Sequence, residues 1–174
     1  IKERWLRLII PLIFGMLVIV PPQIYLERLF EGVDYQSFWQ FYPSIFEGKP
    51  YPEGNTSWHH LWFVLYLFLY SLMAAPLFAW IRSESGKNLR EGLQFFDHPI
   101  RLYLLILPTI LIYCTLAVRF PQTNALIEDY GFFLYWFSFF FVGYLIAAQE
   151  KIWWRIEKNS RRSLQLALFS ILIV

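Results

Sequence analysis

The chain has 174 residues, of which 57% are hydrophobic, 21% are aromatic and only 16% are charged. Water-soluble domains carry about 25% charged residues, and a core of this size could not bury so much apolar surface. The composition therefore excludes an ordinary water-soluble domain and predicts an integral membrane protein. Nucleic-acid binding is not expected, because no Lys/Arg run lies on a soluble module.

Apolar segments follow one another along the chain and predict an all-α fold, a polytopic bundle of transmembrane helices. The segments lie at 8–26, 58–80, 102–118, 130–149 and 163–174. About 20 apolar residues in a helix cross a bilayer, and the last segment is too short. We therefore expect about four complete spans and a truncated fifth. We interpret residues 1–174 as an interior part of one integral-membrane domain.

Prolines should shape two of these spans. Pro21-Pro22 should kink or end the first, because the residue before a proline is pushed away from the helical conformation. Pro108 lies within the third, where the adjacent Thr109 hydroxyl can re-satisfy the carbonyl that the proline frees. The only cysteine, Cys114, lies in an apolar run, so the sequence allows no intramolecular disulfide and no cysteine-based metal site.

The connection 27–57 is long and unusually aromatic. Connections of this length are often functional, and two interpretations are open. The aromatic side chains form a belt at the membrane interface, or they form a lid or a sugar-stacking platform over a site. The Asn55-Thr56-Ser57 triplet in this connection also matches a glycosylation sequon.

The distribution of lysine and arginine predicts the orientation in the membrane. Twelve of the 15 lie in 1–7, 81–101 and 150–162, and the other three lie in 27–57 and 119–129. Because cytoplasmic connections are enriched in these residues, the N-terminus is predicted to be cytoplasmic. The aromatic connection, and the two histidines that open the second span, then face the outside.

Those histidines are the first candidates for chemistry. A bilayer offers a polar group no free partner, so such residues tend to be kept for a purpose. On an α-helix, His59, Trp62 and Tyr66 share a face, and histidine exchanges protons near neutral pH. The alternative is that His59 and His60 only sit at the interface and reach water. No metal site is expected, because adjacent helical residues point about 100° apart.

Arg4 and Arg7 are the candidates at the opposite end. Spaced three apart, they share a helical face, and two guanidinium groups at a cytoplasmic mouth suit phosphate groups. The alternative is that they only set the topology. His98 lies in a predicted cytoplasmic connection and is expected to be structural. The spans contain no acidic residue, which argues against a proton-coupled pump.

Three stretches of the chain resemble the acyltransferase-3 family of integral-membrane O-acyltransferases. They are SWHHLWFVLYLFLYSLMAAPLF at 57–78, KERWLRLIIPLIFGMLVIVPPQIYLERL at 2–29 and YWFSFFFVGYLIA at 135–147. The resemblance covers nearly the whole chain, is most specific at HHLWF, and is closest to the subgroup that succinylates periplasmic glucans. The family commonly has a further arginine where this chain has Glu3.

The resemblance implies transfer of an acetyl or succinyl group from cytoplasmic acyl-CoA to a hydroxyl of an extracytoplasmic glycan or similar acceptor. It implies an integral protein of the bacterial inner membrane, with the lipid bilayer, acyl-CoA and the acceptor as its partners. No tightly bound cofactor is implied, because acyl-CoA is a substrate. Arg4 and Arg7 match the family's arginines, which engage the acyl donor.

His60 matches the family's recurring histidine and is the expected catalytic residue, with His59, Trp62 and Tyr66 in support on the acceptor side. The family's presumed base is a histidine in a first span, which would lie upstream of Ile1. The chain alone is therefore expected to be inactive. Two other classes stay open: a transporter or flippase segment, which would need ionisable residues or broken helices at the membrane midplane, and a purely structural subunit.

Overall fold

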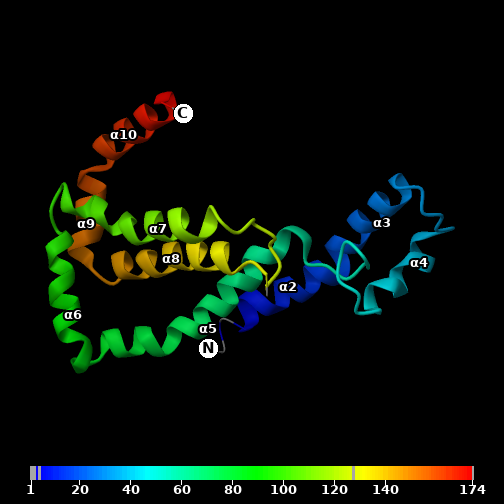
Figure 1. The fold of residues 1–174 in the computed structure, drawn as a ribbon. Coiled ribbons are helices and arrows are strands. Elements are labelled where there is room, and N and C mark those ends of the chain that lie inside the picture. Colours follow the sequence, from blue (N-terminus) through cyan, green and yellow to red (C-terminus); the bar gives the residue numbers. More distant parts are fainter. Residues whose placement is uncertain (1–2, 4, 127, 174) are drawn as a thin grey trace. The chain divides into compact units, whose positions relative to one another are not determined.

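A computed structural model describes residues 3, 5–126 and 128–173. Over these residues the chain is helical, as predicted, and has no β-strand; an isolated bridge joins Pro50 and Thr56 (Figure 1). The chain divides into two compact units, Ile1–Leu72 and Met73–Val174.

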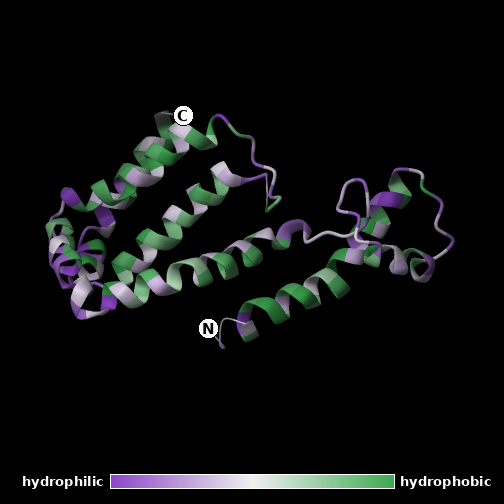
Figure 2. Cartoon of the chain, turned by 60° about the horizontal axis from the view of Figure 1, so that its bottom comes forward, coloured by the Kyte–Doolittle hydropathy of each residue, from purple (hydrophilic) through white to green (hydrophobic). Residues whose placement is uncertain are grey.

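Within the described residues, three helices are long and apolar enough to cross a membrane. They are Trp5–Phe30, His59–Arg82 and Tyr130–Ala147. Arg101–Ala117 is apolar but shorter, so the expected count of four complete spans is not confirmed. Figure 2 shows hydrophobic residues along the long helices and hydrophilic residues gathered in the connections between them.

The first helix continues past the double proline, to Phe30. It contains α2 (Ile10–Phe14), a π-helical turn at Gly15–Ile19 and α3 (Val20–Phe30). The Val20 N–H donates to the carbonyl of Gly15, five residues earlier. The two prolines therefore fall in the first turn of α3, where a missing N–H does least harm. The helix therefore does not end at the double proline, which was one of the two outcomes that the sequence allowed.

The double proline still leaves one carbonyl without a backbone donor. Neither Pro21 nor Pro22 has an N–H, so Leu17 lacks a partner in both the α and the π hydrogen-bonding pattern. The Tyr42 hydroxyl donates to the Leu17 carbonyl at 3.0 Å. An unsatisfied buried acceptor costs about 1–3 kcal/mol, so this hydrogen bond ties the aromatic connection to the interrupted part of the helix.

The second long helix runs antiparallel to the first within the first unit. Trp5 meets Phe68 edge to face, with ring centroids 5.0 Å apart, and Gly15 faces Leu61. A Cβ atom on Gly15 would overlap Leu61 Cδ1, so the glycine permits this close approach. α5 (Trp62–Arg82) thus places its N-terminal end beside the C-terminal end of α3.

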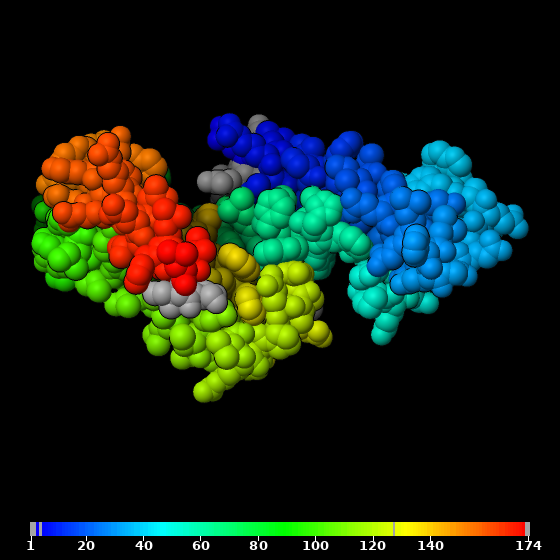
Figure 3. Space-filling model, turned by 90° about the horizontal axis from the view of Figure 1, so that it is seen from above, coloured from blue at the N-terminus to red at the C-terminus, as the bar shows by residue number. Residues whose placement is uncertain are grey.

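Residues 31–58, which we call the cap, fold back onto α3. The cap contains α4 (Phe38–Phe41) and a 3-10 turn at Tyr42–Phe46. It shares a buried cluster with α3, formed by Val20, Ile24, Phe41 and Ile45. In the space-filling view, cap atoms (light blue to cyan) lie against α3 (Figure 3). The cap is therefore packed on α3 through a shared hydrophobic core.

The aromatic side chains of the cap divide into two groups. Phe41 is fully buried, and Tyr35 and Phe38 pack around it. Trp39 and Phe46, by contrast, have exposed fractions of 77% and 64%. Most of the aromatic residues therefore stabilise the cap, and only a minority could meet lipid or a ligand.

The second unit is built on a pair of packed helices. α7 (Leu107–Ile112), flanked by a 3-10 turn at Arg101–Ile106 and a π-helical turn at Tyr113–Ala117, packs against α8 (Tyr130–Ala147). The remaining elements are α6 (Lys87–Gly92), α9 (Glu150–Lys158) and α10 (Ser160–Ile173). A buried cluster of Leu93, Leu102, Leu105 and Ile152 joins the 3-10 turns Leu93–Phe96 and Arg101–Ile106 to α9.

Thr109 has a different role from the predicted one. The carbonyl that Pro108 frees belongs to Leu104, and it accepts the Leu107 N–H in the 3-10 turn. Thr109 instead hydrogen-bonds the Ser138 hydroxyl at 2.8 Å, and Ser138 donates to the Tyr135 carbonyl at 2.6 Å. Thr109 therefore joins α7 to α8 through a buried polar contact.

Candidate functional site

The C-terminal end of α3 carries Arg28, which holds the cap in place. Its Nε donates to Asn55 Oδ1 at 3.0 Å, and its Nη1 pairs with Glu31 Oε2 at 2.7 Å. Its Nη2 donates to the carbonyls of Pro52 and Gly54 at 2.5 and 3.0 Å. Only 15% of this side chain is exposed. The planar guanidinium has several donors in a fixed geometry, so one residue closes a connection of more than 20 residues.

Asn55 is fully engaged in the same network. Its Nδ2 donates to the Ser44 hydroxyl at 2.8 Å and to the Tyr35 hydroxyl at 3.3 Å, while its Oδ1 accepts from Arg28. A glycan on Nδ2 would break these contacts. The match to a glycosylation sequon is therefore explained by a structural role of the asparagine side chain.

Glu27, Tyr51 and His59 meet beside this network. The Tyr51 hydroxyl donates to Glu27 Oε1 at 2.6 Å, and His59 Nε2 lies 3.8 Å from Glu27 Oε2. The rings of Tyr51 and His59 meet edge to face, 5.0 Å apart. The hydrogen bond to Glu27, and then burial, raise the pKa of Tyr51. The hydrogen bond from Tyr51 to Glu27 therefore contributes its full stability below the usual tyrosine pKa of about 10. This contribution is lost only as the pH rises through the higher pKa that Tyr51 has in the folded state.

The conformation of His59 differs from the helical one that the sequence predicted. His59 has a φ of +42° and belongs to a 3-10 turn, His59–Leu61, that precedes α5. Its backbone N–H and its Nδ1 both contact Ser57 Oγ, each at 2.9 Å. The expectation that His59 continues the α-helical face of Trp62 and Tyr66 is therefore wrong, because a turn rather than the helix directs its ring.

Trp62 and Tyr66 do lie together on α5. Their rings meet edge to face with centroids 5.3 Å apart, and Tyr66 is buried. His60, the expected catalytic residue, is exposed in the 3-10 turn that precedes this helix. The two histidines thus have different environments. The ring of His59 lies between Ser57 and Glu27, whereas the side chain of His60 is exposed.

Arg7 lies near the opposite end of the antiparallel helix pair. It is exposed in the first turns of the first helix, whereas Glu27 lies beside His59. Twenty helical residues separate Arg7 from Glu27, a length of about 30 Å. Arg4, its predicted partner, falls outside the described residues. The Arg7 end and the histidine end of the first unit are thus about one bilayer core apart.

Sequence reasoning did not find Glu27, Tyr51 and Ser57. Glu27 and Tyr51 have no periodic relation to the histidines, and only the folded cap brings them together. The short spacing between Ser57 and His59 was the one available signal, since serine often bonds the backbone two residues later. Among the described residues, no group of three His, Cys, Asp or Glu could hold a metal ion.

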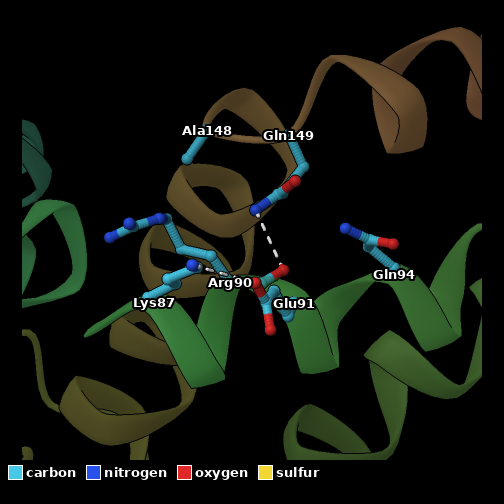
Figure 4. Close-up of a pocket in the computed structure, with 6 residues that line it drawn as sticks. All are labelled: Lys87, Arg90, Glu91, Gln94, Ala148 and Gln149. Atoms are coloured by element: carbon cyan, nitrogen blue, oxygen red, sulfur yellow. Dashed lines mark hydrogen bonds and ion pairs between the residues drawn. The ribbon is translucent and has the colours of Figure 1, made fainter. Parts of the chain in front are cut away.

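The second unit has a polar pocket of about 360 Å³ between α6 and the corner that joins α8 to α9. Its lining residues are Lys87, Arg90, Glu91, Gln94, Ala148 and Gln149 (Figure 4). Lys87 Nζ lies 3.9 Å from Glu91 Oε1, and the Arg90 guanidinium donates to the carbonyls of Ile81 and Ser83. Lys87 is thus paired with a carboxylate, whereas the Arg90 guanidinium is held by neutral carbonyl groups of the same unit.

Comparison with known proteins gives one match. A family model described as an acyltransferase domain, of the acyltransferase-3 type, matches residues 1–174. No curated protein and no solved structure showed a significant match to the chain.

Proposed function

The chain belongs to the acyltransferase-3 family, whose model spans all of it, and we propose that it transfers an acetyl or succinyl group from cytoplasmic acyl-CoA to a hydroxyl on the other side of the membrane. The acceptor is a glycan or a similar hydroxyl compound of the cell envelope. The membrane is the bacterial inner membrane, with the N-terminus of the chain in the cytoplasm.

One observation carries this two-sided proposal. Arg7 and the histidines lie at opposite ends of one antiparallel helix pair, about 30 Å apart along the helix axis. The positive-inside rule favours the arginine end as the cytoplasmic one, where acyl-CoA is found. The cap end then faces the envelope, where the acceptor is found.

The proposed roles follow from the chemistry at each end. Arg7, with Arg4, binds phosphate groups of the donor, since guanidinium groups bind phosphate oxygens in pairs. His60 orients or deprotonates the acceptor hydroxyl or assists passage of the acyl group. His59, Trp62 and Tyr66 support the acceptor side. The bound donor supplies the reactive thioester, and no tightly held cofactor is required.

The donor role of Arg7 predicts a binding defect in Arg7→Ala. We expect the KM for acyl-CoA to rise about tenfold, which corresponds to about 1.4 kcal/mol of lost binding, while the membrane level of the protein stays normal. Arg119→Ala is the matched control, because it removes an exposed arginine from a connection predicted to lie outside. The measurement is acyl-CoA consumption by membranes that contain the intact protein, over a range of acyl-CoA concentrations. An unchanged KM in Arg7→Ala would restrict this residue to setting the topology.

A further inference from the structure

Ser57, His59 and Glu27 form an ordered series of polar contacts. Ser57 Oγ lies 2.9 Å from His59 Nδ1, and His59 Nε2 faces Glu27 Oε2 at 3.8 Å. A carboxylate on the Nε2 side favours the imidazole tautomer that carries its proton on Nε2. Nδ1 is then the accepting nitrogen, and the Ser57 hydroxyl donates to it.

Two further contacts fix this geometry. Tyr51 donates to the other carboxylate oxygen of Glu27 and packs edge-on against the His59 ring. The backbone N–H of His59 donates to Ser57 Oγ at 2.9 Å, so negative charge that develops on this oxygen has a hydrogen-bond donor in place. The positive φ of His59 points both its N–H and its ring at Ser57, in a backbone conformation that costs a residue with a side chain about 1–3 kcal/mol.

We propose that Ser57 is a nucleophile that carries the acyl group as an ester, with His59 as its base and Glu27 as a positioning residue for the imidazole. A nucleophile within hydrogen-bonding reach of a base, which is in turn oriented by a third group, is the general arrangement for covalent catalysis. This inference rests on the proposed function, which supplies the thioester.

The chemistry balances in two steps. In the first, acyl-CoA extends from its phosphate groups at the Arg7 end along the helix pair and presents its thioester at the cap end. Ser57 Oγ attacks the thioester carbon while its proton passes to His59 Nδ1, the C–S bond breaks, and the sulfur leaves as a thiol with that proton. In the second, the acceptor hydroxyl attacks the ester carbon and gives its proton to His59 Nδ1. The bond to Ser57 Oγ then breaks, and the serine takes the proton back.

The exposure of the three groups suits this role. Ser57 is half-buried, and the side chains of His59 and Glu27 have exposed fractions of 23% and 36%. A carbonyl or hydroxyl group can therefore reach the serine, while the ring stays in one orientation. His60 is not part of this series, so its proposed role on the acceptor is independent of Ser57.

The test is covalent labelling of the intact protein in native membranes. Membranes are incubated with radiolabelled acetyl-CoA or succinyl-CoA and quenched in acid, and the peptide that contains Ser57 is isolated. We expect an alkali-labile label on this peptide in the wild type, its loss in Ser57→Ala, and at least a hundredfold slower acylation of membrane glycans by that variant. Ser85→Ala is the matched control, because Ser85 is an exposed serine in another 3-10 turn.

Three more variants separate chemistry from folding. Ser57→Cys keeps a nucleophile and should carry the label as a thioester that hydroxylamine removes at neutral pH. His59→Asn tolerates a positive φ but lacks the base, so its labelling should be at least a hundredfold slower. Glu27→Gln should slow labelling without changing the KM for acyl-CoA, as a positioning residue does.

Two results would overturn the inference. If Ser57→Ala acylates membrane glycans at the wild-type rate, Ser57 carries no acyl group, and the proposed function stands without it. If the wild type transfers no acyl group from acyl-CoA to any acceptor, the proposed function fails, and the covalent step fails with it.

Discussion

Arg28→Ala is expected to release the cap, lowering the free energy of its local unfolding by about 2–4 kcal/mol. A hydrogen bond to a charged group contributes about 1.5–3 kcal/mol, and contributions within one network do not add. The substitution removes the donors to Asn55, Pro52 and Gly54. It also removes the cation that lies 5.5 Å from the centre of the Tyr51 ring.

Hydrogen–deuterium exchange of the purified protein in lipid nanodiscs measures this effect. Amide exchange in peptides from residues 47–58 should speed up by about a hundredfold, because local opening sets the exchange rate there. Arg28→Lys should fall between wild type and Arg28→Ala, since an ammonium cannot reproduce the planar set of donors. Lys49→Ala, which removes an exposed cation of the same cap, should leave the exchange unchanged. Wild-type exchange in Arg28→Ala would show that the hydrophobic core alone holds the cap.

His60→Ala is expected to cause a large loss of activity. A positioned acid or base contributes about 10²–10⁴ to a rate, so acceptor acylation by the intact protein should fall by at least about a hundredfold. His60 is exposed in the 3-10 turn that precedes α5, whereas the ring of His59 already faces Ser57 and Glu27. An acceptor can therefore reach His60 directly.

The control for His60 is a histidine in another part of the chain. His98→Ala removes an imidazole whose Nδ1 accepts the Ile100 N–H at 3.2 Å, and it should keep wild-type activity. Protein levels in the membrane are compared by immunoblot, and acylated product is measured from labelled acyl-CoA. Normal activity in His60→Ala at a normal membrane level would remove this residue from the reaction.

The all-helical fold and the long apolar helices could be predicted because length and composition decide them. The end of the first helix could not. The rule for residues before proline assumes a regular α-helical hydrogen-bonding pattern. Here a π-helical turn precedes the prolines, and the Tyr42 hydroxyl donates to the Leu17 carbonyl that they leave without a backbone donor. The same limit applies to Thr109, whose partner Ser138 lies on another helix.

The candidate site was predictable only in part. The histidines and arginines were visible as polar residues at the ends of apolar segments. The contacts of Arg28 with Asn55, and of Glu27 with Tyr51, join residues 27 and 24 positions apart, and no periodicity encodes them. His59 was predicted to be α-helical, but it has a positive φ in a 3-10 turn. A positive φ at a residue other than glycine has no simple sequence signature.

Membrane sidedness tests most directly whether the two ends of the first unit serve different compartments. Single cysteines are placed at the exposed positions Lys49 and Lys87, with Cys114→Ser as the background, and intact cells are treated with a membrane-impermeant maleimide. We expect Lys49→Cys to be labelled in intact cells and Lys87→Cys only after permeabilisation. Labelling of Lys87→Cys in intact cells, with Lys49→Cys protected, would contradict the proposed transfer from cytoplasm to envelope.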